Sequence, residues 1–281
     1  MPHALVIYGD TRQWYAAKAL KQAGWQVDLC HLGGKNAPIN DREGISLYPC
    51  LSACPDAPFL LLPIPMTKDG ITIVGGGEVA EVEARLHRHK NVICGNPTSH
   101  FQEAAQAHQC EMWDLLKKEE YVAENAILTA EGALGMLLTE TGLSPRRLQV
   151  GIFGYGRIAQ ALSKRLVMLG ANVTVFARRE SAQNQAKADG VFDALPFPPP
   201  CNALQNINVL YNTVPAPISY AQNLAYMPED GIIIELASGK NIILPPHAPQ
   251  RLLLGGGLPG KYMYQSAGQL IAEYVLELAK K

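Results

Sequence analysis

The first third of the chain alternates short apolar runs with segments of helical periodicity. Ala4 to Tyr8 is an apolar run followed by a glycine, and the apolar spacing from Trp14 to Ala23 predicts a helix that stops at Gly24. The other elements predicted in this part are strands at Trp25–Leu29, Leu60–Leu62 and Val92–Cys94 and a helix at Glu78–Lys90. Strands separated by helices favour parallel pairing in a doubly wound sheet.

A second alternation of the same kind follows a long helical pattern. Asn125 to Thr141 carries alanine and leucine residues at helical spacing and ends at Gly142. The elements predicted after it are strands at Gln149–Phe153, Asn172–Phe176, Val209–Asn212, Ile232–Leu236 and Leu252–Leu254, and helices at Ile158–Leu169 and Ser266–Lys281. The pattern predicts an α/β protein with two doubly wound parallel-sheet domains.

The length of 281 residues is sufficient for two domains that each bury a core. We place a substrate-facing, Rossmann-like domain at residues 1–124 and a dinucleotide-binding Rossmann domain at residues 125–265. We expect the final helix, residues 266–281, to pack back on the first domain. A cleft between the domains that closes over the cofactor is part of this prediction.

Composition and charge exclude several classes of protein. Twenty-four Lys and Arg residues against 25 Asp and Glu residues leave a formal charge of −1, whereas a nucleic-acid-binding protein normally carries a basic face or tail. No apolar run approaches the ~20 residues of a membrane-spanning helix, and the amino terminus lacks the features of a signal peptide. Among six scattered cysteines, Cys50 and Cys54 are the only close pair. We expect a cytoplasmic protein without a bound metal.

The strongest chemical signal is a glycine-rich turn between a predicted strand and helix. Gly154, Gly156 and Ala159 form the pattern G-x-G-x-x-A after the strand. In dinucleotide-binding domains the first glycine permits a tight turn, the second lets the backbone approach a pyrophosphate, and the small third residue keeps helix and strand close. The helix then offers free backbone N–H groups to the phosphates. We assign to cofactor binding Gly154, Tyr155, Gly156, Arg157 and Ile158.

The residues that follow the predicted strand Asn172–Phe176 indicate whether NAD or NADP binds. NAD sites usually carry an acidic residue about 20 positions further on, where it binds the ribose hydroxyls. Here Arg178 and Arg179 stand at that point, followed by Ser181. Guanidinium groups and a hydroxyl suit the 2′-phosphate of NADP, which is the cofactor we favour. The alternative is that both arginines are solvated and Glu180 contacts the ribose.

A polar loop after the Val209–Asn212 strand is a second candidate for cofactor contacts. Loops beyond the carboxyl ends of parallel strands line the ligand crevice of a doubly wound sheet. We expect Asn212 and Thr213 to contact the nicotinamide ribose and Val214 to pack on the ring, with Pro215 in the same loop.

Several segments occur in an order that resembles the A-subunit family of dipicolinate synthase. They are G-D-T-R-Q (9–13), the glycine-rich turn with F-A-R-R-E-S (176–181), N-A-I-L-T-A-E-G-A (125–133), N-T-V-P (212–215), E-L-A-S-G-K (235–240) and G-L-P-G-K-Y-M-Y-Q-S-A-G-Q (257–269). The resemblance implies NADP-linked oxidation of a cyclic dihydrodipicolinate-type compound to dipicolinate, the spore-core chelator. It also implies a fold similar to two-domain 2-hydroxy-acid dehydrogenases. The partner that it implies is the flavoprotein-like B subunit of dipicolinate synthase.

The dicarboxylate substrate that this family implies requires cations and N–H groups. Arg12 follows the first predicted strand at the crevice edge and is the leading candidate for a carboxylate fork, with hydrogen bonds from Thr11 and Gln13. The alternative for Arg12 is a surface arginine that caps the following helix. Lys240 and Lys261 are candidates for the second carboxylate.

No motif identifies the group that accepts the proton. Glu131, on the long predicted helix, is the candidate general base or else a carboxylate on the helix surface, and the other residues assigned to catalysis are Arg12 and Lys261. The family carries a lysine where this chain has Gln265, which leaves that cationic role open or moves it to Lys261.

Two other functions fit parts of the sequence. A 2-hydroxy-acid dehydrogenase pairs a histidine with a carboxylate late in its cofactor domain, and His247 with Glu235 is the available pair. A redox sensor binds NADP without converting a substrate, although the G-D-T-R-Q segment is not needed for that role. We also expect the chain to form homo-oligomers.

Overall fold

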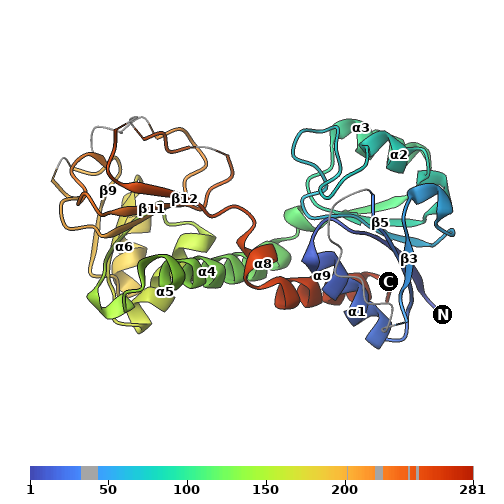
Figure 1. Cartoon of the computed structure of the whole chain (residues 1–281), viewed down its shortest axis with the longest axis horizontal. Helices are drawn as coiled ribbons and strands as arrows, with labels where there is room; N and C mark the ends of the chain where they lie inside the picture. The colour runs from blue at the N-terminus through green and yellow to red at the C-terminus, as the bar shows by residue number, and fades with distance from the viewer. Residues whose placement is uncertain (33–43, 201, 219–223, 240, 245–246, 281) are drawn as a thin grey trace. The chain divides into compact units, whose positions relative to one another are not determined.

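The structure is a computed structural model that describes residues 1–32, 44–200, 202–218, 224–239, 241–244 and 247–280. The chain folds into two compact units, Met1–Asn125 with Met263–Lys281, and Ala126–Tyr262. Each unit contains a six-stranded sheet flanked by helices (Figure 1). All neighbouring strands are parallel, so the predicted α/β class with two doubly wound sheets is confirmed.

The first unit holds the amino-terminal sheet. Its strands are β1 (His3–Ile7), β2 (Gln26–Cys30), β3 (Ser46–Tyr48), β4 (Phe59–Leu61), β5 (Asn91–Cys94) and β6 (Glu111–Asp114). Its helices are α1 (Thr11–Gln22), α2 (Val79–Glu83), α3 (Ser99–Ala107) and α9 (Tyr264–Leu278), with short 3-10 helices η2 (Leu51–Ala53), η3 (Leu86–Arg88) and η4 (Leu115–Lys117). The strand order is β3-β2-β1-β4-β5-β6, which places the reversal of direction between β1 and β4.

Close packing of two helices joins the two ends of the chain within the first unit. Helix α9 lies along α1, as Figure 1 shows. The contact is so tight that a Cβ at Gly268 would lie 2.5 Å from the carbonyl oxygen of Arg12. The absence of a side chain at this one position therefore lets α9 cover the helix that follows the first strand.

The second unit repeats the architecture. Its strands are β7 (Gln149–Phe153), β8 (Asn172–Ala177), β9 (Asp193–Pro196), β10 (Val209–Asn212), β11 (Ile232–Glu235) and β12 (Arg251–Leu254). Its helices are α5 (Arg157–Met168), α6 (Glu180–Ala188) and α8 (Leu258–Lys261), with the 3-10 helix η5 (Pro145–Arg147), and α4 (Glu119–Thr141) enters it from the first unit. The order β12-β11-β10-β7-β8-β9 reverses between β7 and β10. Helices cover both faces, which explains strands such as β10 and β11 whose residues are all buried.

The helix predicted over Glu78–Lys90 is wrong in its extent. Helix α2 stops at Glu83, and a separate 3-10 helix follows. Arg85 lies between them with its buried guanidinium donating to the backbone carbonyls of Leu51, Cys54 and Pro55. These long-range bonds break the local helical periodicity.

Two further features, a membrane-spanning helix and a metal-binding cluster, are absent from the described part of the chain. Its helices include none that is both long and apolar enough to cross a membrane. Within the same residues, no group of three or more His, Cys, Asp or Glu side chains is arranged to hold a metal ion.

Candidate functional site

The glycine-rich turn lies at the carboxyl end of β7, where the strand order reverses. Gly154 has a φ of +88°, in the left-handed region that favours glycine, and a Cβ there would lie 2.7 Å from Thr213 Oγ1. Gly156 is the N-cap of α5, and no atom lies within 4 Å of the position that its Cβ would take. Packing therefore requires the first glycine, whereas the second leaves open space at the amino terminus of α5.

This open helix end fits the pyrophosphate of a nicotinamide dinucleotide. The first N–H groups of a helix lack intrahelical acceptors and carry a partial positive charge. No side chain caps α5, since its N-cap is Gly156. A side chain at position 156 would fill the space that a phosphate needs, and the chain has none there.

The loop after β10 is anchored directly to the turn. Thr213 donates two hydrogen bonds to the carbonyl oxygen of Phe153, from its backbone nitrogen at 3.1 Å and from its hydroxyl at 2.7 Å. Gly154 N in turn donates to the carbonyl oxygen of Phe176 on β8 at 2.9 Å. The carboxyl ends of β7, β8 and β10 thus form one hydrogen-bonded edge.

Asn212 does not offer its side chain to a ligand, contrary to the expectation of a ribose contact. It is fully buried. Its Nδ2 donates to Glu235 Oε1 at 2.7 Å and to the carbonyl oxygen of Val214 at 3.2 Å, while Oδ1 accepts from Val214 N at 3.0 Å. Asn212 therefore shapes the loop, and the half-buried Thr213 and Val214 and the exposed Pro215 form its surface.

Glu235 is a buried carboxylate that the sequence did not single out as structural. It is 3% exposed. Besides Asn212, it accepts hydrogen bonds from the backbone nitrogens of Ala237 and Asn241, both at 3.2 Å, and of Ile242 at 3.1 Å. Neutral donors thus satisfy the charge and hold the loops after β10 and β11 together. An acidic residue at the end of an all-isoleucine strand was the available signal.

The histidine–carboxylate pair of a 2-hydroxy-acid dehydrogenase does not form here. His247 is exposed in a turn, and no contact joins it to Glu235 among the described residues. The hydrogen bonds that the structure gives to Glu235 come from Asn212 at the end of β10 and from backbone N–H groups of the loop after β11.

Tyr155 contributes to the turn through its backbone only. Its ring is part of the apolar core, and its hydroxyl donates to Asp189 Oδ2 at 2.7 Å. Burial raises the pKa of Tyr155 to about 12. Ile158 also packs against this core, whereas Arg157 is exposed at the start of α5.

The two arginines after β8 lie one strand away from the turn. Phe153 and Phe176 are partners in the β7–β8 register, so these strands end side by side. Arg178 and Arg179 are exposed, and within the described residues neither guanidinium has a hydrogen-bond or ion-pair partner. Ser181 is exposed in the first turn of α6. Two uncompensated cations beside an open helix terminus suit a phosphate.

Arg12 is not the free carboxylate fork that the sequence predicted. It is 8% exposed, and its Nε donates to both oxygens of Asp10 at 3.0 and 3.2 Å while Nη2 donates to Oδ2 at 2.7 Å. Burial alone would lower the pKa of Arg12, but the hydrogen bonds and charge of Asp10 outweigh it and raise the pKa. Asp10, not Arg12, caps α1, because its Oδ1 accepts from Arg12 N at 2.9 Å.

The residues on either side of Arg12 are also tied into the fold. Gln13 is fully buried, and its Oε1 accepts from Asp10 N at 2.9 Å, which completes a capping box. Its Nε2 has no acceptor among the described residues. Thr11 is half-buried beside the hydroxyl of Tyr8.

The remaining catalytic candidates are scattered. Glu131 Oε1 accepts from Arg165 Nη2 at 2.7 Å, so its carboxylate ties α4 to α5. That ion pair gives no support to Glu131 as the proton acceptor. Lys261 is exposed at the end of α8 and has no partner among the described residues. Lys240 lies outside the described residues.

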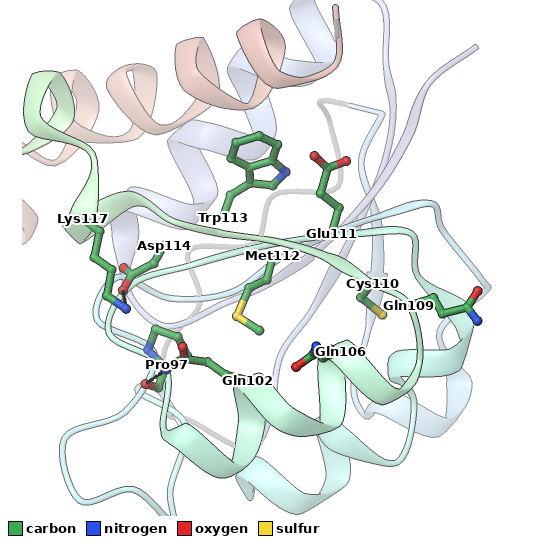
Figure 2. A pocket seen from close by; sticks show the side chains of 10 residues that line it. All are labelled: Pro97, Gln102, Gln106, Gln109, Cys110, Glu111, Met112, Trp113, Asp114 and Lys117. Atoms are coloured by element: carbon green, nitrogen blue, oxygen red, sulfur yellow. Dashed lines mark hydrogen bonds and ion pairs between the residues drawn. The ribbon is translucent and has the colours of Figure 1, made fainter.

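A hollow of about 590 Å³ in the first unit lies between α3 and the edge strand β6. Figure 2 shows Met112 and Gln102 facing it, with Trp113 on the opposite side of the strand. Its one lysine, Lys117, is 3.9 Å from Asp114 Oδ2, so little positive charge is left for a dicarboxylate. It contains none of the predicted site residues.

Comparison with known proteins divides the chain in two. Residues 3–116 match the N-terminal domain of the dipicolinate synthase A subunit. Residues 131–243 match the NAD-binding domain of D-isomer specific 2-hydroxyacid dehydrogenases, in agreement with the geometry of the glycine-rich turn. A nicotinamide cofactor of an oxidoreductase is therefore supported.

Individual relatives match the chain across both of these parts. The dipicolinate synthase A subunit of Bacillus subtilis (strain 168) is 25% identical over 230 residues, 78% of this chain and 76% of that protein. The crystal structure of the dipicolinate synthase A subunit from Bacillus halodurans has a TM-score of 0.80 at 22% identity, with 100% of this chain and 98% of that one covered. The A chain from Bacillus subtilis has a TM-score of 0.78 at 22% identity, with 99% and 96% covered. The resemblance inferred from the sequence is confirmed: the chain is similar to the dipicolinate synthase A subunit, its residues 3–116 match that family's amino-terminal domain, and its residues 131–243 match a dehydrogenase NAD-binding domain.

Proposed function

We propose that this chain is an NADP-dependent oxidoreductase that oxidises a cyclic dihydrodipicolinate-type compound to dipicolinate in spore-core dipicolinic acid biosynthesis. The observation that carries the cofactor half of this proposal is the pairing of an open helix terminus at Gly156 with two exposed, unpaired guanidinium groups at Arg178 and Arg179. The relatives named for the A subunit of dipicolinate synthase support the substrate half.

The choice of NADP over NAD rests on charge. A 2′-phosphate adds charge at the end of β8, where a carboxylate would repel it and a guanidinium would bind it. Glu180 begins α6 next to these arginines, so the ribose contact of an NAD site is the competing arrangement. The guanidinium groups of Arg178 and Arg179 outnumber the single carboxylate of Glu180, so the local charge favours the 2′-phosphate of NADP.

In this reaction the protein binds a cyclic substrate with two carboxylates and allows its ring to lose a proton. The bound nicotinamide supplies the hydride acceptor. Aromatisation of the product ring provides much of the driving force, so alignment and charge recognition remain for the protein. We propose that the Arg12 N–H groups not used by Asp10 bind a carboxylate of the substrate, with Thr11 beside them. Lys261, exposed at the end of α8, is a separate candidate for carboxylate binding in the second unit.

A flavoprotein-like B subunit is the proposed partner, since the relatives are named for the A component of a synthase. The pairing of Glu131 with Arg165 leaves the proton acceptor unassigned among the candidates of this chain. We therefore include the partner in the assay of the complete reaction.

We predict that a substitution at Gly154 mainly lowers stability, whereas a substitution at Gly156 mainly weakens nucleotide binding. Gly156→Ala should leave the free energy of unfolding within about 1 kcal/mol, because its Cβ meets no atom, but should weaken nucleotide binding at least about tenfold by occupying the phosphate position. Gly154→Ala should cost about 1–3 kcal/mol of stability, because φ is +88° and Thr213 is in the way. Urea unfolding and calorimetric titration measure both. Unchanged binding by Gly156→Ala contradicts the assignment of the turn.

We predict that Arg178→Asp weakens the binding of NADP far more than the binding of NAD. Loss of a charge-assisted hydrogen bond worth about 1.5–3 kcal/mol should raise the Kd for NADP by about 10- to 100-fold, with little change in the Kd for NAD. Arg147→Asp is the matched control, since it makes the same charge change at an exposed arginine of η5 and should alter neither Kd. Equal affinity of the parent protein for NAD and NADP would overturn the NADP proposal.

The reaction is tested with freshly generated dihydrodipicolinate precursor and NADP, with and without the candidate partner. We expect formation of dipicolinate, measured by its ultraviolet absorbance and by mass spectrometry, together with stoichiometric reduced nucleotide. Substrate-independent nucleotide binding with no turnover would support a redox sensor instead. Oxidation of simple 2-hydroxy acids but not of the cyclic compound would indicate a 2-hydroxy-acid dehydrogenase.

A further inference from the structure

Arg178 and Arg179 form the whole connection between a strand and a helix of the second unit. Strand β8 ends at Ala177, and α6 begins at Glu180. Both arginines are exposed, and Arg179 is the N-cap of α6, with an extended backbone and no capping hydrogen bond from its side chain. The directions of the two guanidinium groups therefore depend on what holds the backbone of this connection.

A single residue of α6, Gln183, binds the backbone carbonyl group at each end of the connection. Its side-chain Nε2 donates to the carbonyl oxygen of Ala177 at 2.7 Å. Its backbone nitrogen donates to the carbonyl oxygen of Arg179 at 3.2 Å, and this oxygen also accepts from Ala182 N at 3.0 Å. The backbone bond can form with almost any residue at position 183, whereas the bond to Ala177 requires a side chain that carries a donor.

The carbonyl group of Ala177 precedes Arg178 directly, so its orientation matters for that side chain. Besides Gln183, the backbone nitrogen of Phe197, which follows β9, donates to it at 3.2 Å. A peptide group is planar, so a carbonyl held by two donors also fixes the N–H and the Cα of the next residue. The position of the Cα then sets the direction in which the Arg178 side chain leaves the backbone.

Helix α6 is held at its other end by separate contacts. Asp189, the C-cap of α6, accepts a hydrogen bond from the hydroxyl of Tyr155 at 2.7 Å and lies 3.4 Å from Lys164 Nζ. These contacts do not involve Gln183. Loss of the Gln183 amide is therefore expected to leave α6 in place and to release only the connection that carries the arginines.

We propose that Gln183 is a positioning residue for the recognition of NADP, a role that rests on the NADP-dependent function proposed above. Its amide is engaged with Ala177 and acts on the nucleotide through Arg178 and Arg179. Binding is weaker when it must first order a flexible side chain. Since the 2′-phosphate is the part of NADP that NAD lacks, Gln183 contributes to the preference for NADP and not to the binding that the two nucleotides share.

The test compares the affinities of the full chain for NADP and NAD, measured by calorimetric titration, in the parent protein and in Gln183→Met. Methionine keeps the length and the helix propensity of glutamine but has no donor. We expect the Kd for NADP to rise about 3- to 10-fold and the Kd for NAD to change by less than about twofold. Gln183→Ala also removes the donor, should give the same result, and is the second variant if methionine disturbs folding.

The matched control is Asn184→Met, which introduces the same side chain at the next, exposed position of α6 and should change neither Kd. A triple variant then tests whether Gln183 acts through the arginines. With Arg178 and Arg179 both changed to alanine, Gln183→Met should have no further effect on the Kd for NADP, because no guanidinium remains to be positioned. A further rise in that Kd would mean a direct contact with the nucleotide and would overturn the positioning role.

The outcomes separate this inference from the proposed function. A parent protein that prefers NADP, with the same preference in Gln183→Met, would leave the function standing and overturn the role of Gln183. An equal loss of affinity for both nucleotides, or the same loss in Asn184→Met, would indicate a general effect on the fold and would overturn it too. A parent protein without a preference for NADP would overturn both proposals.

Discussion

The close approach of two loops at the carboxyl ends of β7 and β10 is the constraint on which the cofactor site depends. Thr213 gives both its N–H and its hydroxyl to the carbonyl oxygen of Phe153, which draws the second loop against the glycine-rich turn. A side chain at position 154 would meet Thr213, so packing demands glycine there. At Gly156, the residue after Tyr155, no atom lies near the position that a Cβ would take, so the backbone is open at the start of α5. The same contact therefore fixes the turn and leaves room for a phosphate.

Buried charged side chains organise the polypeptide near the strand ends within each unit. In the second unit, Glu235 accepts hydrogen bonds from Asn212 and from three backbone N–H groups of the loop after β11, and in the first unit Arg12 is held by Asp10 at the start of α1. A buried polar group that loses its hydrogen-bond partner typically costs about 1–3 kcal/mol. Loops held in this way keep the groups at their surface, such as the half-buried Val214, in fixed positions, which favours alignment of reactants.

The sequence predicted the parts of this protein that local patterns control. Strand and helix periods located the glycine-rich turn correctly, because its strand, its glycines and its helix are contiguous. Long-range pairings were not predictable in this way. The break after α2 comes from Arg85 binding carbonyls about thirty residues earlier, and the roles of Asn212 and Glu131 depend on Glu235 and Arg165, which are distant in the sequence. No single-sequence pattern records which distant partner a polar side chain will meet.

The central claim is that a dinucleotide lies across the turn with its extra phosphate at the end of β8. A crystal structure of the chain grown with NADP tests it directly. We expect the pyrophosphate at the N–H groups of α5 beside Gly156, and the 2′-phosphate within hydrogen-bond distance of Arg178 or Arg179. A nucleotide bound elsewhere, or a 2′-phosphate in solvent with both guanidinium groups turned away from it, would contradict this claim.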